Sequence, residues 1–313
     1  MNIQEVIQHI KNSNQITFAI INKTSKDPTF DVTKLILKNT LHEEIKNLFT
    51  SYISIFSNFS IQEFNPLASL DETLYYLNNQ DYQCINNLLT SIGNINDVNN
   101  INSSIFHDKI SNSIAYAFIF TNENQNVILV KKTNSNYTLK NKFLWIFKND
   151  GLDKIQDQSF VFDEKIDCII TPNETYVFSK YNFEIIFSFM NEYTKTVNQI
   201  LNKLQNNNLI NGIDQFREDI SSRNKLIKKL FKMEQDGSID KFIECINDEN
   251  IRQNIKNAIN DLNLNFELNE NNQIVYNDVS ALGEILNLIS NDYNISIYNG
   301  EKFLTQVKKR LEL

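Results

Sequence analysis

The chain has few glycines, histidines and cysteines, and these scarcities exclude several classes of protein. Its six glycines are so dispersed that no two of them could share a phosphate-binding loop. Neither a Walker A sequence nor a dinucleotide-binding fingerprint can therefore be written, which argues against ATPases, GTPases and Rossmann oxidoreductases. The three histidines, His9, His42 and His107, have no spacing typical of a metal site, and we expect no metal or cofactor.

The chain also lacks paired cysteines and long apolar runs. Cys84, Cys168 and Cys245 lie far apart, and each stands beside an isoleucine, so we expect buried free thiols in a reducing compartment. The N-terminus has no features of a signal peptide, and no apolar run approaches the ~20 residues that span a bilayer. These absences predict a soluble, cytoplasmic protein.

Hydrophobic periodicity over the 313 residues predicts an α+β protein. We expect a mixed or antiparallel β-sheet with packed helices in the N-terminal two-thirds, and a mainly helical C-terminal region with a small hairpin. Polar, turn-rich stretches mark two boundaries. The predicted parts are an N-terminal α/β region at 1–104, a central β-rich domain with its following long helix at 105–205, and the helical region at 206–313.

The pattern of apolar residues also predicts individual elements within these parts. The predicted helices cover residues 3–10, 41–59, 71–77, 82–92, 182–204, 279–290 and 300–311, and residues 213–233 and 239–262 are expected to be mostly helical. The predicted strands cover residues 16–22, 32–37, 113–121, 127–133, 142–148, 160–169 and 175–179, and the small hairpin covers 265–276.

A basic segment at residues 217–232 is the first candidate for a binding surface. Its cations, within three helical turns, are Arg223, Lys225, Lys228, Lys229 and Lys232. Such a helix could bury its apolar stripe and present its lysines to the phosphates of a polyanion, although an ordinary solvated helix face is the simpler explanation. A second cluster, which could extend this patch or stabilise a helix end, consists of Lys308, Lys309 and Arg310. The net charge of −8 excludes a uniformly basic surface but allows a local basic patch.

A second candidate is the triplet Asp163-Glu164-Lys165, which has the Asp-x-Lys form of a restriction-type nuclease strand. In such sites carboxylates hold Mg²⁺ and the lysine helps to position the attacking water. The upstream metal ligand would be Asp150, Asp153 or Asp157. Such a triplet often occurs by chance, and polarity at the end of a strand explains Asp163 adequately. Asp163 and Lys165 are therefore weak nuclease candidates, and no catalytic residue is predicted.

Two blocks of sequence carry a resemblance to a known family. The first reads F-x-F-D-x-x-I-D over residues 160–167 and continues as Y-V-F-x-K-x-x-F-E-x-x-F over 176–187. The second comprises residues 266–276 and the segment LNLISNDY at 286–293, followed by the basic end. In these blocks the chain resembles the KwaB-like family of the bacterial Kiwa anti-phage system.

The resemblance implies a bacterial immunity protein that binds phage duplex DNA and suppresses its replication and expression. It also implies a homodimer or higher homo-oligomer that acts with a KwaA-like multi-span membrane protein, which could recruit it to the inner face of the cell membrane. The family brings no established catalytic residues, so none is transferred. Three functions stay open: a DNA-binding effector, a metal-dependent nuclease at Asp163 and Lys165, and a non-catalytic scaffold for the membrane partner.

Overall fold

A computed structural model describes residues 1–23, 29–67, 72–94, 108–123, 125–133, 145–148, 151–154, 164–295 and 302–304. The chain divides into two compact units: the first comprises Met1–Phe64 and Ser69–Phe189, and the second comprises Asn65–Ala68 and Met190–Leu313. This division differs from the predicted three parts, because strands from residues 1–104 and from residues 105–205 pair within one sheet.

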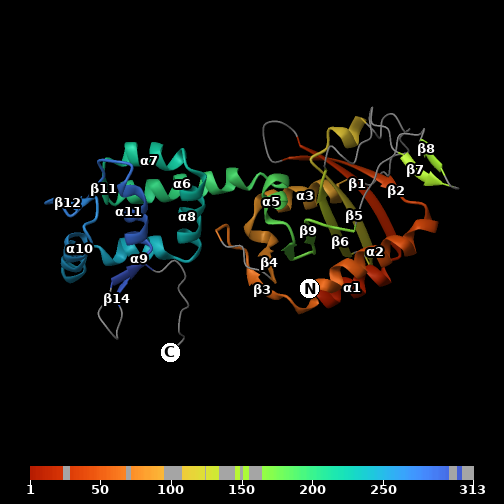
Figure 1. Cartoon of the computed structure of the whole chain (residues 1–313), viewed down its shortest axis with the longest axis horizontal. Helices are drawn as coiled ribbons and strands as arrows, with labels where there is room; N and C mark the ends of the chain where they lie inside the picture. The colour runs from red at the N-terminus through yellow and green to blue at the C-terminus, as the bar shows by residue number, and fades with distance from the viewer. Residues whose placement is uncertain are drawn as a thin grey trace. The chain divides into compact units, whose positions relative to one another are not determined.

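An eight-stranded sheet forms the first unit, in the order β2-β1-β5-β6-β9-β10-β4-β3 (Figure 1). The strands are β1 Gln15–Lys23, β2 Phe30–Ile36, β3 Ser60–Glu63, β4 Thr73–Asn78, β5 Ala115–Asn122, β6 Gln125–Lys132, β9 Cys168–Ile170 and β10 Glu174–Val177. Neighbouring strands run antiparallel except β3 and β4, which are parallel. The predicted mixed sheet is therefore confirmed.

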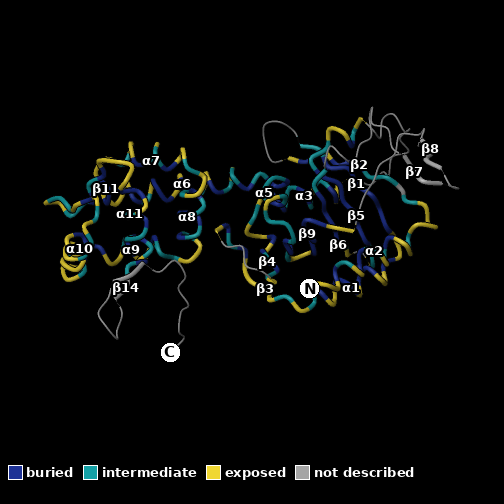
Figure 2. Tube along the Cα trace, viewed as in Figure 1, coloured by how far each residue is buried: buried dark blue, intermediate teal, exposed yellow. Residues whose placement is uncertain are grey.

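Helices cover both faces of this sheet. On one side lie α1 (Ile3–Asn12) and α2 (His42–Ser54), and on the other lie α3 (Gln83–Gly93) and α5 (Lys180–Ile186) (Figure 1). All residues of β1 from Ile16 to Ile21 are buried, as expected of a strand covered on both faces (Figure 2). Aromatic side chains fill the α2 side, where the Phe49 and Phe118 ring centroids are 4.9 Å apart.

The remaining elements of the first unit are short. They are the 3₁₀ helices η1 (Asn39–Leu41), η2 (Ile55–Asn58) and η3 (Asn79–Asp81), and the two-stranded sheet of β7 (Trp145–Lys148) and β8 (Gly151–Lys154). Asn2 begins α1 by a capping box, in which its side chain accepts from the Glu5 amide at 2.9 Å.

The second unit is mainly helical, as predicted. Its elements are α6 Phe189–Asn206, β11 Ile210–Asn211, α7 Ile213–Ser221, α8 Asn224–Gln235, α9 Ser238–Cys245, α10 Glu249–Leu262, β12 Glu267–Leu268, β13 Ile274–Val275, α11 Ala281–Ile289, β14 Tyr293–Ile295 and β15 Lys302–Leu304. The predicted hairpin is confirmed as β12 and β13, and β11 adds a parallel strand to it. In the described part of the chain, no helix is both long and apolar enough to cross a membrane.

Four local predictions were wrong. Residues 73–77, predicted as helix, belong to β4, because β3 and β10 supply backbone hydrogen-bond partners on both sides. The predicted helix at 182–204 is broken between α5 and α6, where Ser188 has a φ of 51°. In the predicted helix at 300–311, the described residues 302–304 are a strand paired with β14, and the later residues lie outside the described part. Cys245 is exposed rather than buried.

Candidate nucleic-acid interface

Helix α8 carries the basic segment, and its apolar face attaches it to the second unit. Ile227, Leu230, Phe231 and Met233 are buried. The Phe231 ring packs edge-on against Tyr193 of α6, with ring centroids 4.7 Å apart. Burial of this stripe at helical spacing fixes which residues point outward. The basic residues therefore lie toward the partly or fully exposed side of the helix.

Two of the five predicted cations are neutralised within the second unit. Arg223, just before the first turn of α8, donates to the Asp219 carbonyl at 2.6 Å, and its guanidinium lies 3.5 Å from the Asp219 carboxylate. Lys229 donates to the Asn287 side chain, and its Nζ lies 3.3 Å from the Asp292 carboxylate. These contacts tie α8 to α7 and to the end of α11, so we assign both cations a structural role.

The carboxylate that holds Arg223 is itself held in place by a tyrosine. The Tyr276 hydroxyl donates to Asp219 at 2.7 Å, and this hydrogen bond lowers the pKa of Asp219. Burial raises the pKa of Tyr276, so its hydroxyl remains a donor at neutral pH. Asp219 is therefore a permanent counter-charge beside Arg223.

The other three cations form what we call the α8 lysine stripe: Lys225, Lys228 and Lys232. Positions i, i+3 and i+7 share one helix face, so the outer two nitrogens project from points on the order of 10 Å apart along the helix axis. Lys228 Nζ lies 5.6 Å from the centroid of the Tyr193 ring, a cation–π contact. Lys225 is exposed and Lys232 half-buried, and neither meets an acidic partner in the part of the chain that the structure describes.

The remaining predicted residues cannot be joined to this stripe. Lys308, Lys309, Arg310 and Asp163 lie outside the described residues. Lys165 belongs to the first unit, where it is exposed. Within the described ranges, no group of three or more histidine, cysteine or carboxylate side chains could hold a metal ion. The proposed nuclease site therefore gains no support from the described residues.

Asp167, in the first block that resembles the family, is a buried structural carboxylate. It accepts from the backbone amide of Lys132 at 2.6 Å and from the Asn182 side chain at 2.8 Å. Burial is the main cause that raises its pKa, while these hydrogen bonds act in the opposite direction. Because Lys132 is on β6 and Asn182 is on α5, this carboxylate holds α5 against the sheet. Sequence reasoning marked Asp167 as a fixed position without finding this role.

The partners Asp219, Asn287 and Asp292 were also missed. Asp219 lies one helical turn before Arg223, so an i,i+4 ion pair could have been expected from their spacing. Asn287 and Asp292 are 58 and 63 residues from Lys229, and only the packing of α11 brings them to it. Their role could not be read from local sequence.

Together these features describe a two-unit α+β protein with a lysine stripe on its helical unit. A model of the family described as "Kiwa protein KwaB-like" matches residues 110–299. The match covers more than half of the 313 residues, and the chain therefore belongs to this family, a component of the Kiwa anti-phage defence system. It includes both blocks that carried the resemblance but ends before the basic cluster at 308–310. No curated protein and no solved structure matches the chain.

Proposed function

We propose that this Kiwa component is a DNA-binding effector that contacts the phosphates of duplex DNA through the α8 lysine stripe. The observation that supports the proposal is that the five cations differ in whether the second unit pairs them with a carboxylate. Carboxylates of the second unit neutralise Arg223 and Lys229, whereas Lys225 and Lys232 meet no acid among the described residues. A cation that the fold leaves unpaired can release counterions from a polyanion, whereas a paired one has to break its own contact first.

The mechanism requires charge and position rather than hydrolysis. Lysine is a compact point charge that contacts phosphate without reading the bases, so the stripe would position DNA with little sequence preference. The net charge of −8 would repel DNA from the rest of the surface and restrict contact to the stripe. In this proposal the protein works as a homodimer or higher oligomer with a KwaA-like membrane protein, and it suppresses phage DNA replication and expression.

Salt dependence of DNA affinity tests the stripe directly. Each phosphate contact contributes about −0.9 to the slope of log affinity against log salt, so Lys225→Gln with Lys232→Gln should make the slope shallower by about 1.8. The matched control is Lys241→Gln with Lys256→Gln, which removes the same charge from exposed positions on α9 and α10. An equal change in slope for both double variants would show that overall charge, not the stripe, determines binding.

The same samples distinguish the effector from the other two functions. Cleavage of DNA that requires Mg²⁺ and disappears in Asp163→Ala would replace the proposal with a nuclease. Absence of DNA binding at every salt concentration, with retained co-purification of the membrane partner, would replace it with a scaffold.

A further inference from the structure

Within the described residues, no strand pairs with the outer side of β3. β3 is the last strand in the sheet order, and all four of its residues are exposed (Figure 2). On its inner side, the amide of Ser60 donates to the carbonyl of Glu72, just before β4, at 3.0 Å, and the amide of Phe64, just after β3, donates to the carbonyl of Tyr76 in β4 at 2.8 Å. Because bonding residues alternate along a parallel pair, the backbone groups of Ile61 and Glu63 point away from β4.

This edge is only partly protected against pairing. β3 is short and carries the charge of Glu63, but its sequence Ser-Ile-Gln-Glu has no proline or lysine and its register with β4 has no bulge, and the negative charge of Glu63 would not oppose a basic partner. Ile61 is an exposed apolar side chain, with 46% of its surface accessible. An extended segment could therefore bond to the outward amides while an apolar side chain covers Ile61.

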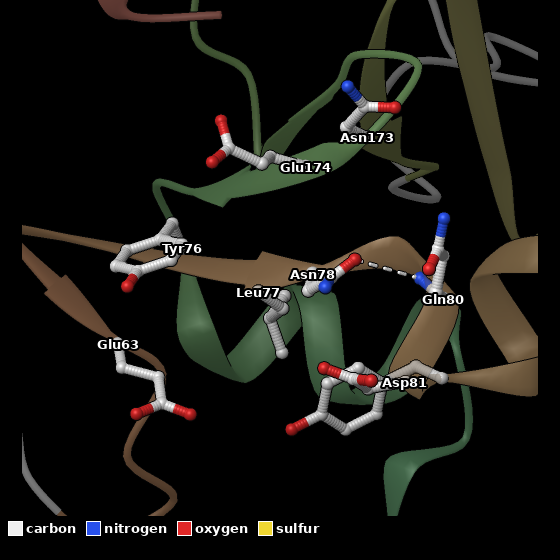
Figure 3. A pocket seen from close by; sticks show the side chains of 9 residues that line it. Glu63, Tyr76, Leu77, Asn78, Gln80, Asp81, Asn173 and Glu174 are labelled. Carbon is white, nitrogen blue, oxygen red and sulfur yellow. Dashed lines mark hydrogen bonds between the residues drawn. The ribbon is translucent and has the colours of Figure 1, made fainter.

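A polar cavity of about 560 Å³ adjoins the end of β3 (Figure 3). Three strands and η3 contribute to its lining, with Glu63 from β3, Tyr76 and Asn78 from β4, Glu174 from β10 and Asp81 from η3. Its three acidic residues give it a negative charge at neutral pH.

The three carboxylates differ in whether a cationic group contacts them. Glu174 accepts from the Met1 amino group at 3.2 Å and from the Tyr176 hydroxyl at 3.0 Å. Glu63 and Asp81 have no cationic partner among the residues that the structure places. The cavity beside the open edge therefore complements a long side chain with a positive charge at its tip.

We propose that β3 and the adjoining cavity form a docking surface for an extended, lysine- or arginine-bearing segment of another protein. The segment would add a strand to β3 and place a basic side chain between Glu63 and Asp81. Charge selects this occupant over a second copy of the chain, since a copy would bring a further acidic edge against Glu63 and carries a net charge of −8. This surface belongs to the first unit and does not depend on the proposed DNA contact.

Ile61 and Glu63 lie on the same face of β3, so the apolar and basic side chains of the segment must stand two residues apart. The test uses the full chain and short fluorescent peptides in which valine and lysine occupy alternate positions of one face, separated by threonine, with glutamate in place of lysine as the control. The lysine peptide should bind, and Glu63→Lys should weaken it by about tenfold or more, equal to about 1.4 kcal/mol. Glu164→Lys is the matched control, because it makes the same charge change at an exposed position of the first unit that does not line the cavity. Equal binding of both peptides, or equal weakening by both variants, would overturn the proposal.

Backbone pairing is tested separately. Ile61→Pro removes an outward amide without breaking a bond to β4 and should also weaken the lysine peptide, whereas Ile61→Val keeps the amide and should not. Should the proline variant fold poorly, hydrogen exchange on the unaltered chain gives the same information. Saturating peptide should slow exchange of the amides of Ile61 and Glu63, and unchanged exchange there would overturn strand addition.

Discussion

Lys229, one of the five cations predicted to contact DNA, is engaged in contacts that stabilise the packing of the second unit. Only 23% of the Lys229 side chain and 12% of Asp292 are exposed, and their charged atoms lie 3.3 Å apart. Lys229→Met keeps the aliphatic stem but leaves Asp292 and the Asn287 carbonyl oxygen without this donor. Hydrogen bonds to charged groups contribute about 1.5–3 kcal/mol, so we expect the free energy of unfolding to fall by about 2 kcal/mol.

Urea denaturation followed by far-ultraviolet circular dichroism measures this loss. With a denaturant slope of about 2 kcal/mol per molar, a loss of about 2 kcal/mol lowers the midpoint by about 1 M. Lys225→Met is the matched control on the same helix, and it should change stability by less than about 0.5 kcal/mol because Lys225 is exposed. Similar midpoints for the two variants would refute the structural role of Lys229. Lys229 would then again be a candidate for DNA contact.

Three further predictions concern contacts that hold each unit together. Asp167→Ala should cost about 2–3 kcal/mol in urea denaturation, because a backbone amide of β6 loses its acceptor; a neutral effect would contradict this. Gly212→Ala should destabilise more than Gly237→Ala, and equal losses would contradict the geometry. Both glycines have positive φ, but only at Gly212 would a Cβ meet a backbone atom, the Tyr276 oxygen at 2.7 Å. Because the pKa of Asp219 is lowered on folding, its contribution to stability is present above the ordinary carboxyl pKa of about 4 and is lost as pH falls through the folded-state value. Tyr276→Phe should therefore reduce the loss of stability on acidification, and an unchanged acid titration would count against that hydrogen bond.

Most of the fold was predictable because its elements carry strong local patterns. The continuous apolar run of β1 and the stripe of α8 each bury the residues that their periodicity indicates. β4 was missed because the same short apolar segment suits a helix or a strand, and one of its two strand neighbours, β10, comes from a distant part of the chain. The break at Ser188 was missed because serine carries no signal for a positive φ.

The candidate site was predicted only in part, because contacts between distant segments again decide what local sequence does not show. Sequence placed five cations on one basic segment, and this segment does form a helix with a buried apolar face. Which cations remain available depends on Asn287 and Asp292, which tertiary packing brings to Lys229. Local sequence shows how many cations the segment contains, whereas the fold determines which of them lack an acidic partner.

The most direct test of the central claim is the affinity of the unaltered chain for labelled duplex DNA across a salt series. Fluorescence anisotropy would be recorded with and without Mg²⁺, and each sample would then be run on a denaturing gel. Three phosphate contacts through the α8 lysine stripe predict a slope of log affinity against log salt of about −2.7, with the DNA intact. Binding that does not respond to salt, or no binding at any salt concentration, would contradict the account.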